Sequence, residues 1–263
     1  MIHLRFFPLL LLTLLIPTIL HAQRSAEVNA VDESIEDALL RSDVLFEQTK
    51  YRASHGILKA LHEKHPNNAA VLWRLASHMI NDGDGSSNAE RKEALYRKAV
   101  EYSLAAVKSD NANANAHAYL AASWGSVGMF EGGKEKVKLA NNIRDELNHA
   151  LKLDPNNQVA LTIYGTWHRE VSDVSWVERQ LANMFLGSLP DGSIEQSIRY
   201  FKKAIKLGPD VFRHRFELAL TYIAADRIKD AAASFRAALK CPTRWKTDDP
   251  RRPRIREWLK ENG

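Results

Sequence analysis

One short segment carries the residue types of a zinc site. His62-Glu63-Lys64-His65 brings two histidines and a glutamate together, as zinc proteases do on a helix. The zinc motif places its histidines at i and i+4, on one helical face. Here the histidines are three residues apart, and Pro66, which ends a helix, follows directly. The spacing therefore argues against zinc binding by this segment.

A second segment has the spacing of a calcium-binding loop. Its oxygen-bearing side chains fall at offsets 1, 3, 5, 7, 9 and 12, and they are Asp82, Asp84, Ser86, Asn88, Glu90 and Glu93. Ser87, however, stands where the sharp turn of such a loop requires glycine. The simpler interpretation is a polar loop between two helices, in which Ser87 or Asn88 caps a helix that begins near Glu90.

The remaining reactive residues lack partners in the sequence. Cys241 is the only cysteine, so it cannot form a disulfide within the chain, and no pattern around it marks an activating base. We expect it to be a half-buried structural thiol. Gly132-Gly133-Lys134 has no preceding strand, as a phosphate-binding loop would need. The sequence thus predicts no catalytic residue, no metal site, no cofactor and no enzymatic activity, with an enzyme of unrecognised site as an alternative.

Helices are the elements expected to position these side chains. The 263 residues include only 12 Gly and 9 Pro and no alternating run of β-branched residues, so no sheet is predicted. Turns recur around Pro66, Asn111, Pro155 and Pro209, which are 45, 44 and 54 residues apart. Each turn is followed directly by a new apolar helical pattern, which is typical of a helix-turn-helix array.

Small residues at fixed places support this array. Ala106, Ala150 and Ala204 each lie five residues before a turn residue, and Ala238 lies four before Pro242. In tetratricopeptide repeats, small residues at this place let paired helices approach closely. The predicted fold is all-α, a tetratricopeptide-like α-solenoid of about five helix pairs within residues 23–260, with insertions because the turns are farther apart than about 34 residues. An ordinary bundle of Ala-rich helices is the alternative, since helical periodicity does not fix connectivity.

The N-terminus has the layout of a secretory leader. A slightly positive start precedes the apolar residues 6–20, and polar residues begin at Gln23. We expect residues 1–22 to be a signal peptide that is cleaved after Ala22, with export to a periplasm, a secretory lumen or the outside. Alternatively, residues 6–20 anchor the chain in a membrane with the remainder facing the cytosol, although they are fewer than the roughly 20 residues that span a bilayer.

The charge is mildly basic, with a formal net charge of +5. Seven basic residues and four acidic ones lie within residues 244–261. We expect residues 253–260 to form a solvated helix that caps the last repeat with Ile255, Trp258 and Leu259. Attraction of this tail to an acidic surface is the alternative.

The inner face of the array is the expected binding surface. In a tetratricopeptide array the first helix of each pair lines this face. Its predicted positions are here apolar or neutral and lack the Lys and Asn residues that bind a peptide carboxylate. We therefore expect an apolar guest, which is a lipid chain, an amphipathic partner helix or the chain's own insertion. The candidate lining residues are Trp73, Ala118, Ala122, Trp124, Trp167, Trp176, Arg179, Phe216 and Leu220.

The insertion itself covers residues 171–189 and has the pattern of a short amphipathic helix. It is either a lid over the groove or extra core packed on the array. Within it, Arg179 is placed to meet an anionic head group at the mouth of an apolar site.

Several segments also resemble a known family. They are Asn115-Ala116-His117, Val127-Gly128-Met129-Phe130-Glu131-Gly132, Ala150-Leu151-Lys152-Leu153-Asp154-Pro155 and Gly165-Thr166-Trp167, followed by Trp176, Arg179, Met184-Phe185 and Pro190. Together they resemble the tetratricopeptide-like domain of the regulator of microtubule dynamics family over about residues 35–240. The resemblance implies a non-enzymatic helical-repeat protein. Animal members are linked to microtubules and spindles, and one membrane-anchored member is a lipid-binding tether at organelle contacts.

The sequence thus predicts a binding module for an apolar or amphipathic guest, with a protein or a lipid as partner and no nucleic acid. The alternative is a microtubule-associated regulator whose basic residues engage acidic tubulin tails, if the chain is cytosolic. Cellular location separates the two hypotheses, because an exported chain cannot meet tubulin.

Overall fold

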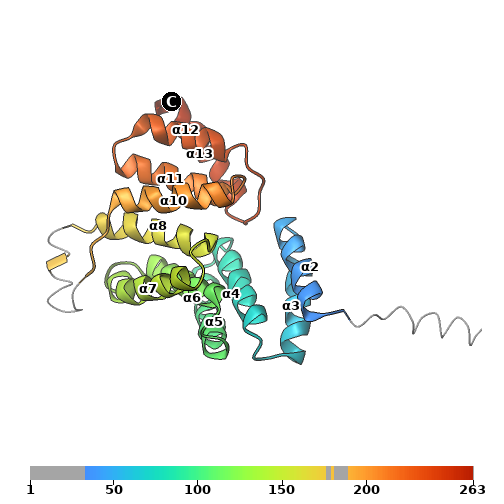
Figure 1. The fold of residues 1–263 in the computed structure, drawn as a ribbon. Coiled ribbons are helices and arrows are strands. Elements are labelled where there is room, and N and C mark those ends of the chain that lie inside the picture. The colour runs from blue at the N-terminus through green and yellow to red at the C-terminus, as the bar shows by residue number, and fades with distance from the viewer. Residues whose placement is uncertain (1–32, 176–178, 181–188, 263) are drawn as a thin grey trace, which may run out of the picture. The chain divides into compact units, whose positions relative to one another are not determined.

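The computed structural model describes residues 33–175, 179–180 and 189–262. These residues form eleven helices and no strand, which confirms the prediction of an all-α protein (Figure 1). The leader, Trp176 and most of the insertion lie outside the described residues. The chain divides into a short unit, Met1–Ala38, and a helical unit, Leu39–Gly263, which contains the repeats.

Successive helices of this unit pack as pairs, as predicted for a tetratricopeptide-like solenoid. α2 (Ile35–Glu47), which belongs to this unit from Leu39 onward, contacts α3 (Tyr51–Lys64) where Ser42 Oγ lies 2.9 Å from Ser54 Oγ. The pairs that follow are α4 (Ala69–Asp84) with α5 (Ala89–Ser109), α6 (Ala114–Glu131) with α7 (Gly133–Leu153), α8 (Gln158–Ser172) with α10 (Ile194–Leu207), and α11 (Phe212–Ala224) with α12 (Ile228–Ala238). The terminal helix α13 (Asp248–Asn262) follows the last pair.

Asparagine side chains start the first helix of three pairs. Asn68, Asn113 and Asn157 accept hydrogen bonds from backbone N–H groups in the first turns of α4, α6 and α8. Asn88 caps α5 in the same way by accepting from the N–H of Arg91 at 2.7 Å, which confirms the predicted cap. These contacts satisfy backbone donors that a helix start leaves unpaired, so they fix where each helix begins.

Small residues allow the helices to approach closely. Ala106, Ala150, Ala204 and Ala238 are all fully buried, as the repeat pattern predicts. Gly165 on α8 faces the ring of Phe201 on α10, and a Cβ atom at position 165 would lie 2.8 Å from that ring. A larger residue would therefore separate these two helices.

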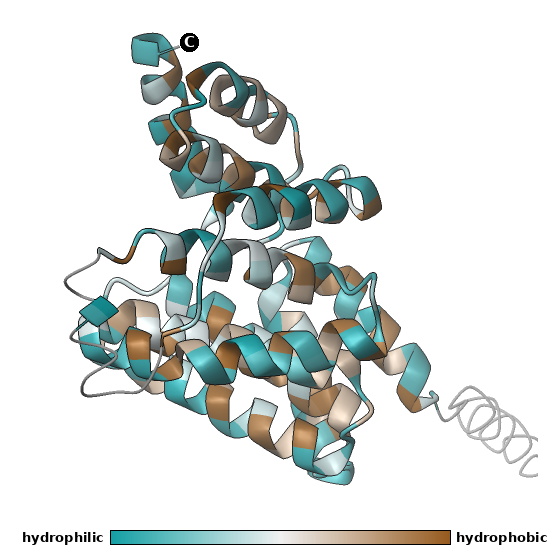
Figure 2. Ribbon diagram, turned by 60° about the vertical axis from the view of Figure 1, so that its left-hand side comes forward, coloured by the Kyte–Doolittle hydropathy of each residue, from teal (hydrophilic) through white to brown (hydrophobic). Residues whose placement is uncertain are grey.

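Two features account for the wide spacing of the turns. α5 and α7 each contain 21 residues, so the second helix of these pairs is long. The third interval contains the insertion between α8 and α10. Hydrophobic and hydrophilic residues alternate along the helices, as expected of amphipathic helices that bury one side (Figure 2).

The last helix caps the array as expected. Ile255 of α13 is 2% exposed and packs with Trp258 and Leu259 on the core formed by α11 and α12. The helix begins at Asp248, five residues before the predicted start. Among the described residues, no helix combines the length and apolarity needed to cross a bilayer.

Candidate functional site

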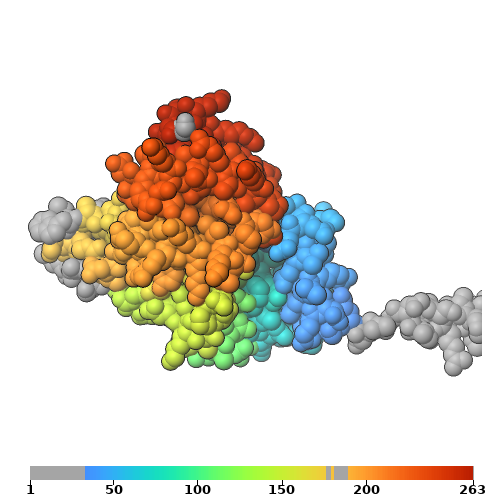
Figure 3. All heavy atoms as spheres, turned by 45° about the horizontal axis from the view of Figure 1, so that its top comes forward, coloured from blue at the N-terminus to red at the C-terminus, as the bar shows by residue number. Residues whose placement is uncertain are grey.

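A cavity of about 610 Å³ lies on the inner side of the helical unit. Helices α2, α4, α6, α8 and α11 contribute to its walls, together with residues from the C-terminal segment that follows α12. In the space-filling view, atoms of the orange and red C-terminal half directly border the blue and cyan helices (Figure 3). The array therefore brings its two ends together around this cavity.

The apolar part of the lining comes from several elements of the array. It includes Phe46, Trp73, Ile80, Tyr119, Val159, Ile163 and Trp245. Trp73 and Tyr119 stack with ring centroids 5.2 Å apart, so α4 and α6 present one continuous aromatic surface. Such a surface favours contact with an apolar guest.

The candidate residues named from the sequence divide into two groups. Trp73, Ala122 and Trp167 line the cavity, and Trp167 is oriented by donating its indole N–H to the carbonyl of Ala140 at 2.9 Å. Ala118 is fully buried between helices, and Trp124 packs against the same core; neither lines the cavity.

Phe216 and Leu220 pack in the C-terminal core beside α12 and α13, not along the cavity. The terminal helix needs an apolar surface to cover, and this face of α11 provides it. Arg213, His214 and Glu217 consequently face the cavity in their place. The inner face is therefore more polar than the sequence positions indicated.

Arg179 also lies away from the cavity lining. Its guanidinium donates to the carbonyls of Val171, Leu189 and Pro190 at 3.1–3.2 Å. These bonds hold the two ends of the insertion together, so Arg179 supports the chain's own backbone. Trp176 lies outside the described residues.

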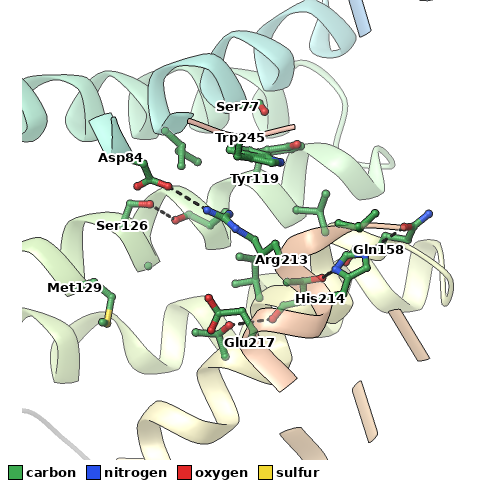
Figure 4. Close-up of a pocket in the computed structure, with 18 of the residues that line it drawn as sticks. Ser77, Asp84, Tyr119, Ser126, Met129, Gln158, Arg213, His214, Glu217 and Trp245 are labelled. Atoms are coloured by element: carbon green, nitrogen blue, oxygen red, sulfur yellow. Dashed lines mark hydrogen bonds and ion pairs between the residues drawn. The ribbon is translucent and has the colours of Figure 1, made fainter. Parts of the chain in front are cut away.

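Ion pairs between different repeats form the polar side of the cavity. Arg213 of α11 contacts Asp84 of α4 at 3.1 Å, and Figure 4 shows its side chain reaching toward that carboxylate. Arg169 of α8 contacts Glu217 of α11 at 2.8 Å. Both pairs are mostly shielded from solvent. Removal of one partner should therefore destabilise the fold more than removal of one partner of a surface ion pair.

Two arginines in this region have unsatisfied donors. Among the described residues, the buried Nε of Arg213 and the buried Nη1 of Arg251 have no hydrogen-bond partner. Arg213 lies over the Trp245 ring at 4.6 Å, and Arg251 lies over the Phe216 ring at the same distance. Burial, followed by the nearby charge of Arg213, lowers the pKa of Arg251. An acidic group beside these guanidinium groups would accept hydrogen bonds from the unpaired donors and would raise the pKa of Arg251.

The acidic residues of the calcium-like segment have other roles. α4 extends to Asp84, so the first residues of that spacing lie on a helix and cannot form a loop. Asp82 pairs with Lys246 at 2.7 Å, while Asp84 accepts from Tyr96 at 2.7 Å and pairs with Arg213. In the described part of the chain, no group of three His, Cys, Asp or Glu side chains is placed to hold a metal ion.

A protein-family model matches most of the chain and identifies its family. The family model for Regulator of microtubule dynamics protein 1-3 matches residues 38–263. The chain belongs to this family. It is 28% identical to Regulator of microtubule dynamics protein 1 of Bos taurus over 201 residues, covering 75% of this chain and 62% of that protein. It is 25% identical to protein 3 of Xenopus laevis over 210 residues, covering 79% of this chain and 44% of that protein.

A solved structure supports the fold of this regulator of microtubule dynamics family member. A thermophilic tetratricopeptide repeat protein of Thermus thermophilus matches with a TM-score of 0.57 and 16% identity, covering 87% of this chain and 98% of that one. At this identity the likeness concerns the fold alone. The chain spans less than two thirds of the length of the curated relatives named above.

Sequence reasoning missed the residues that make the family member's cavity polar. Arg213 and Glu217 lie one turn apart on α11, so both project to the same side of the helix. This spacing of four residues could have indicated a charged side on the helix. Nothing in the sequence pattern showed that Trp245 and Arg251, which follow the last repeat, would return to helices more than a hundred residues earlier.

Two buried histidines of the family member make stability dependent on pH. Burial, followed by the charges of Arg213, Arg244 and Arg215, lowers the pKa of His214 from 6.5 to about 4. Burial, followed by the charge of His55, lowers the pKa of His78 to about 4 as well. Thr162 Oγ1 lies 2.9 Å from Nδ1 of His214, within hydrogen-bond distance.

We expect His214 to destabilise the fold in acid. Its pKa is lower in the folded chain than the unfolded value of 6.5, so the unfolded chain binds the extra proton between pH 6.5 and about 4. The part of the free energy of unfolding that depends on neutral His214 is fully present above this window. It is lost as the pH falls through the window, by up to about 3 kcal/mol. Urea unfolding at several pH values should show a smaller acid loss for His214→Asn. Equal losses in both chains would mean that His214 is not kept neutral by burial.

Proposed function

We propose that this protein is a non-enzymatic binding module whose cavity takes an amphipathic guest with an acidic end. The observation that carries this proposal is the pair of arginines with unsatisfied donors, Arg213 and Arg251, in the same cavity as the aromatic surface of Trp73 and Tyr119. A volume of about 610 Å³ is suited to a small ligand.

The two sides of the cavity suit the two ends of one molecule. An alkyl chain would contact the apolar side, where Ile80 and Ile163 extend the aromatic surface. A carboxylate or phosphate would accept hydrogen bonds from Nε of Arg213 and Nη1 of Arg251, which otherwise have no partner. A lipid-like acid meets both requirements, and this is the guest class we favour over a partner helix.

The proposal predicts a preference for acids that depends on Arg251. A fluorescent long-chain fatty acid should bind purified protein saturably, and Arg251→Gln should weaken binding about 10-fold or more, the effect of losing a charge-assisted hydrogen bond. Arg254→Gln is the matched control, because it removes the same charge from an exposed position of the same helix. Equal affinities of the two variants, or equal binding of the corresponding fatty alcohol, would contradict the acidic subsite. Saturable binding of an amphipathic helical peptide instead of the acid would favour a protein partner.

A second candidate function rests on the names of the relatives, which are regulators of microtubule dynamics. In that case basic residues of this chain would engage acidic tubulin tails. We propose export with cleavage after Ala22, and a membrane anchor at residues 6–20 with the remainder in the cytosol is the alternative. N-terminal sequencing of the mature protein distinguishes them. A start at Gln23 in an exported fraction excludes tubulin as a partner, whereas an intact N-terminus on a membrane facing the cytosol makes microtubule cosedimentation the next test.

A further inference from the structure

Residues 242–247 form a strap between α12 and α13 that reaches the opposite end of the array. The hydroxyl of Tyr51, at the start of α3, donates to the carbonyl of Arg244 at 2.9 Å. The backbone N–H of Lys246 donates to Asn81 Oδ1 on α4 at 2.9 Å. The strap thus binds residues that precede it by 165–193 positions.

Trp245 is the aromatic residue of the strap that lines the cavity. It lines the cavity and packs against Met79, Ile80, Tyr119 and their neighbours. Its ring also meets Phe46 edge-on at 5.3 Å. With the strap in place, Trp245 therefore forms one part of the cavity wall, next to α2 and α4.

The strap has a defined shape of its own. Asp248, at the start of α13, accepts hydrogen bonds from the backbone N–H groups of Arg244 and Trp245 at 2.9 and 3.0 Å. These bonds lie within the C-terminal segment and do not involve α3 or α4. The strap can therefore leave those helices as a unit while it remains attached to α13.

Its attachment to α3 and α4 is slight. Apart from the Trp245 ring, it depends on the two hydrogen bonds above, on the partly exposed ion pair of Lys246 with Asp82, and on the contact of Lys246 Nζ with the Tyr51 ring at 5.5 Å. Exposed ion pairs contribute little to stability. Close contact is possible because position 85 is glycine, where a Cβ atom would lie 3.1 Å from Cβ of Lys246.

From these contacts we propose that the strap is the gate of the cavity, which releases α3 and α4 to admit or discharge the guest and then closes over it. The identity of the guest rests on the proposed function, whereas the gating motion rests on the strap contacts alone. Arg244 and Trp245 belong both to the strap and to the cavity wall, so release of the strap opens the cavity directly.

A disulfide between the strap and α4 tests the gate. In Gly85→Cys/Lys246→Cys/Cys241→Ser, the Cβ atoms are near the separation of about 3.5–4.5 Å that a disulfide requires, after a small shift. The probe is a fluorescent palmitic acid. Oxidation should slow both its association and its dissociation by roughly tenfold or more, and reduction of the same sample should restore both rates. Equal rates in the oxidised and reduced forms would overturn the proposal.

A complementary variant loosens the strap without altering the cavity lining. Tyr51→Phe/Asp82→Asn removes one hydrogen bond and one ion pair, and neither residue lines the cavity. Loss of these contacts should raise the population of the open form and speed probe exchange about fivefold.

An accessibility measurement keeps the gate testable if no fatty acid binds. A thiol is placed in the cavity by Ala122→Cys, a position that is 7% exposed, in a Cys241→Ser background. Its alkylation by N-ethylmaleimide should be about fivefold faster when Tyr51→Phe/Asp82→Asn is added. Faster alkylation without fatty acid binding would reject the proposed guest and retain the gate. Equal alkylation rates would reject the gate whatever the guest.

Discussion

Replacement of Arg169 by methionine should lower the free energy of unfolding by about 3–5 kcal/mol. The Arg169 side chain is 11% exposed and that of its partner Glu217 is 12% exposed, with 2.8 Å between the charged atoms. Arg169 also donates to the backbone carbonyl of Glu217 at 3.1 Å. Its removal leaves a carboxylate with little access to water and without this partner. Urea unfolding followed by circular dichroism measures the loss.

Two comparisons make this result interpretable. Arg97→Met removes an arginine whose side chain is 56% exposed, and it should destabilise the fold much less than Arg169→Met. Arg169→Met/Glu217→Leu removes both charges, so it should be more stable than Arg169→Met alone. A loss for Arg169→Met no greater than for Arg97→Met would show that α8 and α11 are not joined by a shielded ion pair.

Replacement of Phe201 by alanine should cost a similar amount, about 3–5 kcal/mol. Phe201 is fully buried on α10, and its ring fills the space beside Gly165 on α8. Truncation removes apolar contacts and leaves a cavity that glycine cannot fill. Thermal and urea unfolding measure the effect, with the exposed neighbour Lys202→Ala as a control that should stay within about 0.5 kcal/mol of the parent chain. If the two variants unfold alike, the packing of this pair is not as described.

The fold could be predicted because its determinants are local. The turns at Pro66, Asn111, Pro155 and Pro209 and the alanines before them encode helix pairs without reference to distant residues. The structure places the four alanines at fully buried positions. Asn88 was likewise recognisable as a cap from its immediate neighbours.

The candidate site was only partly predictable because it depends on contacts between distant segments. Trp73, Ala122 and Trp167 followed from repeat positions and do line the cavity. Phe216 was assigned by the same rule, but α13 covers that face of α11. The sequence predicted a capping helix, but the repeat pattern did not show which face of α11 it would cover. Arg251 and Trp245 enter the cavity only because the chain after the last repeat turns back to α3 and α4.

The most direct test is to locate the guest by photocrosslinking. A palmitic acid analogue that carries a diazirine in its alkyl chain is bound to the purified protein, irradiated and mapped by peptide mass spectrometry. We expect labels on cavity-lining residues such as Ile80, Tyr119 and Ile163, suppressed by excess unlabelled acid. Labels confined to exposed apolar residues of the outer surface, such as Leu40 and Leu104, which are 63% and 47% exposed, would contradict a guest in the cavity.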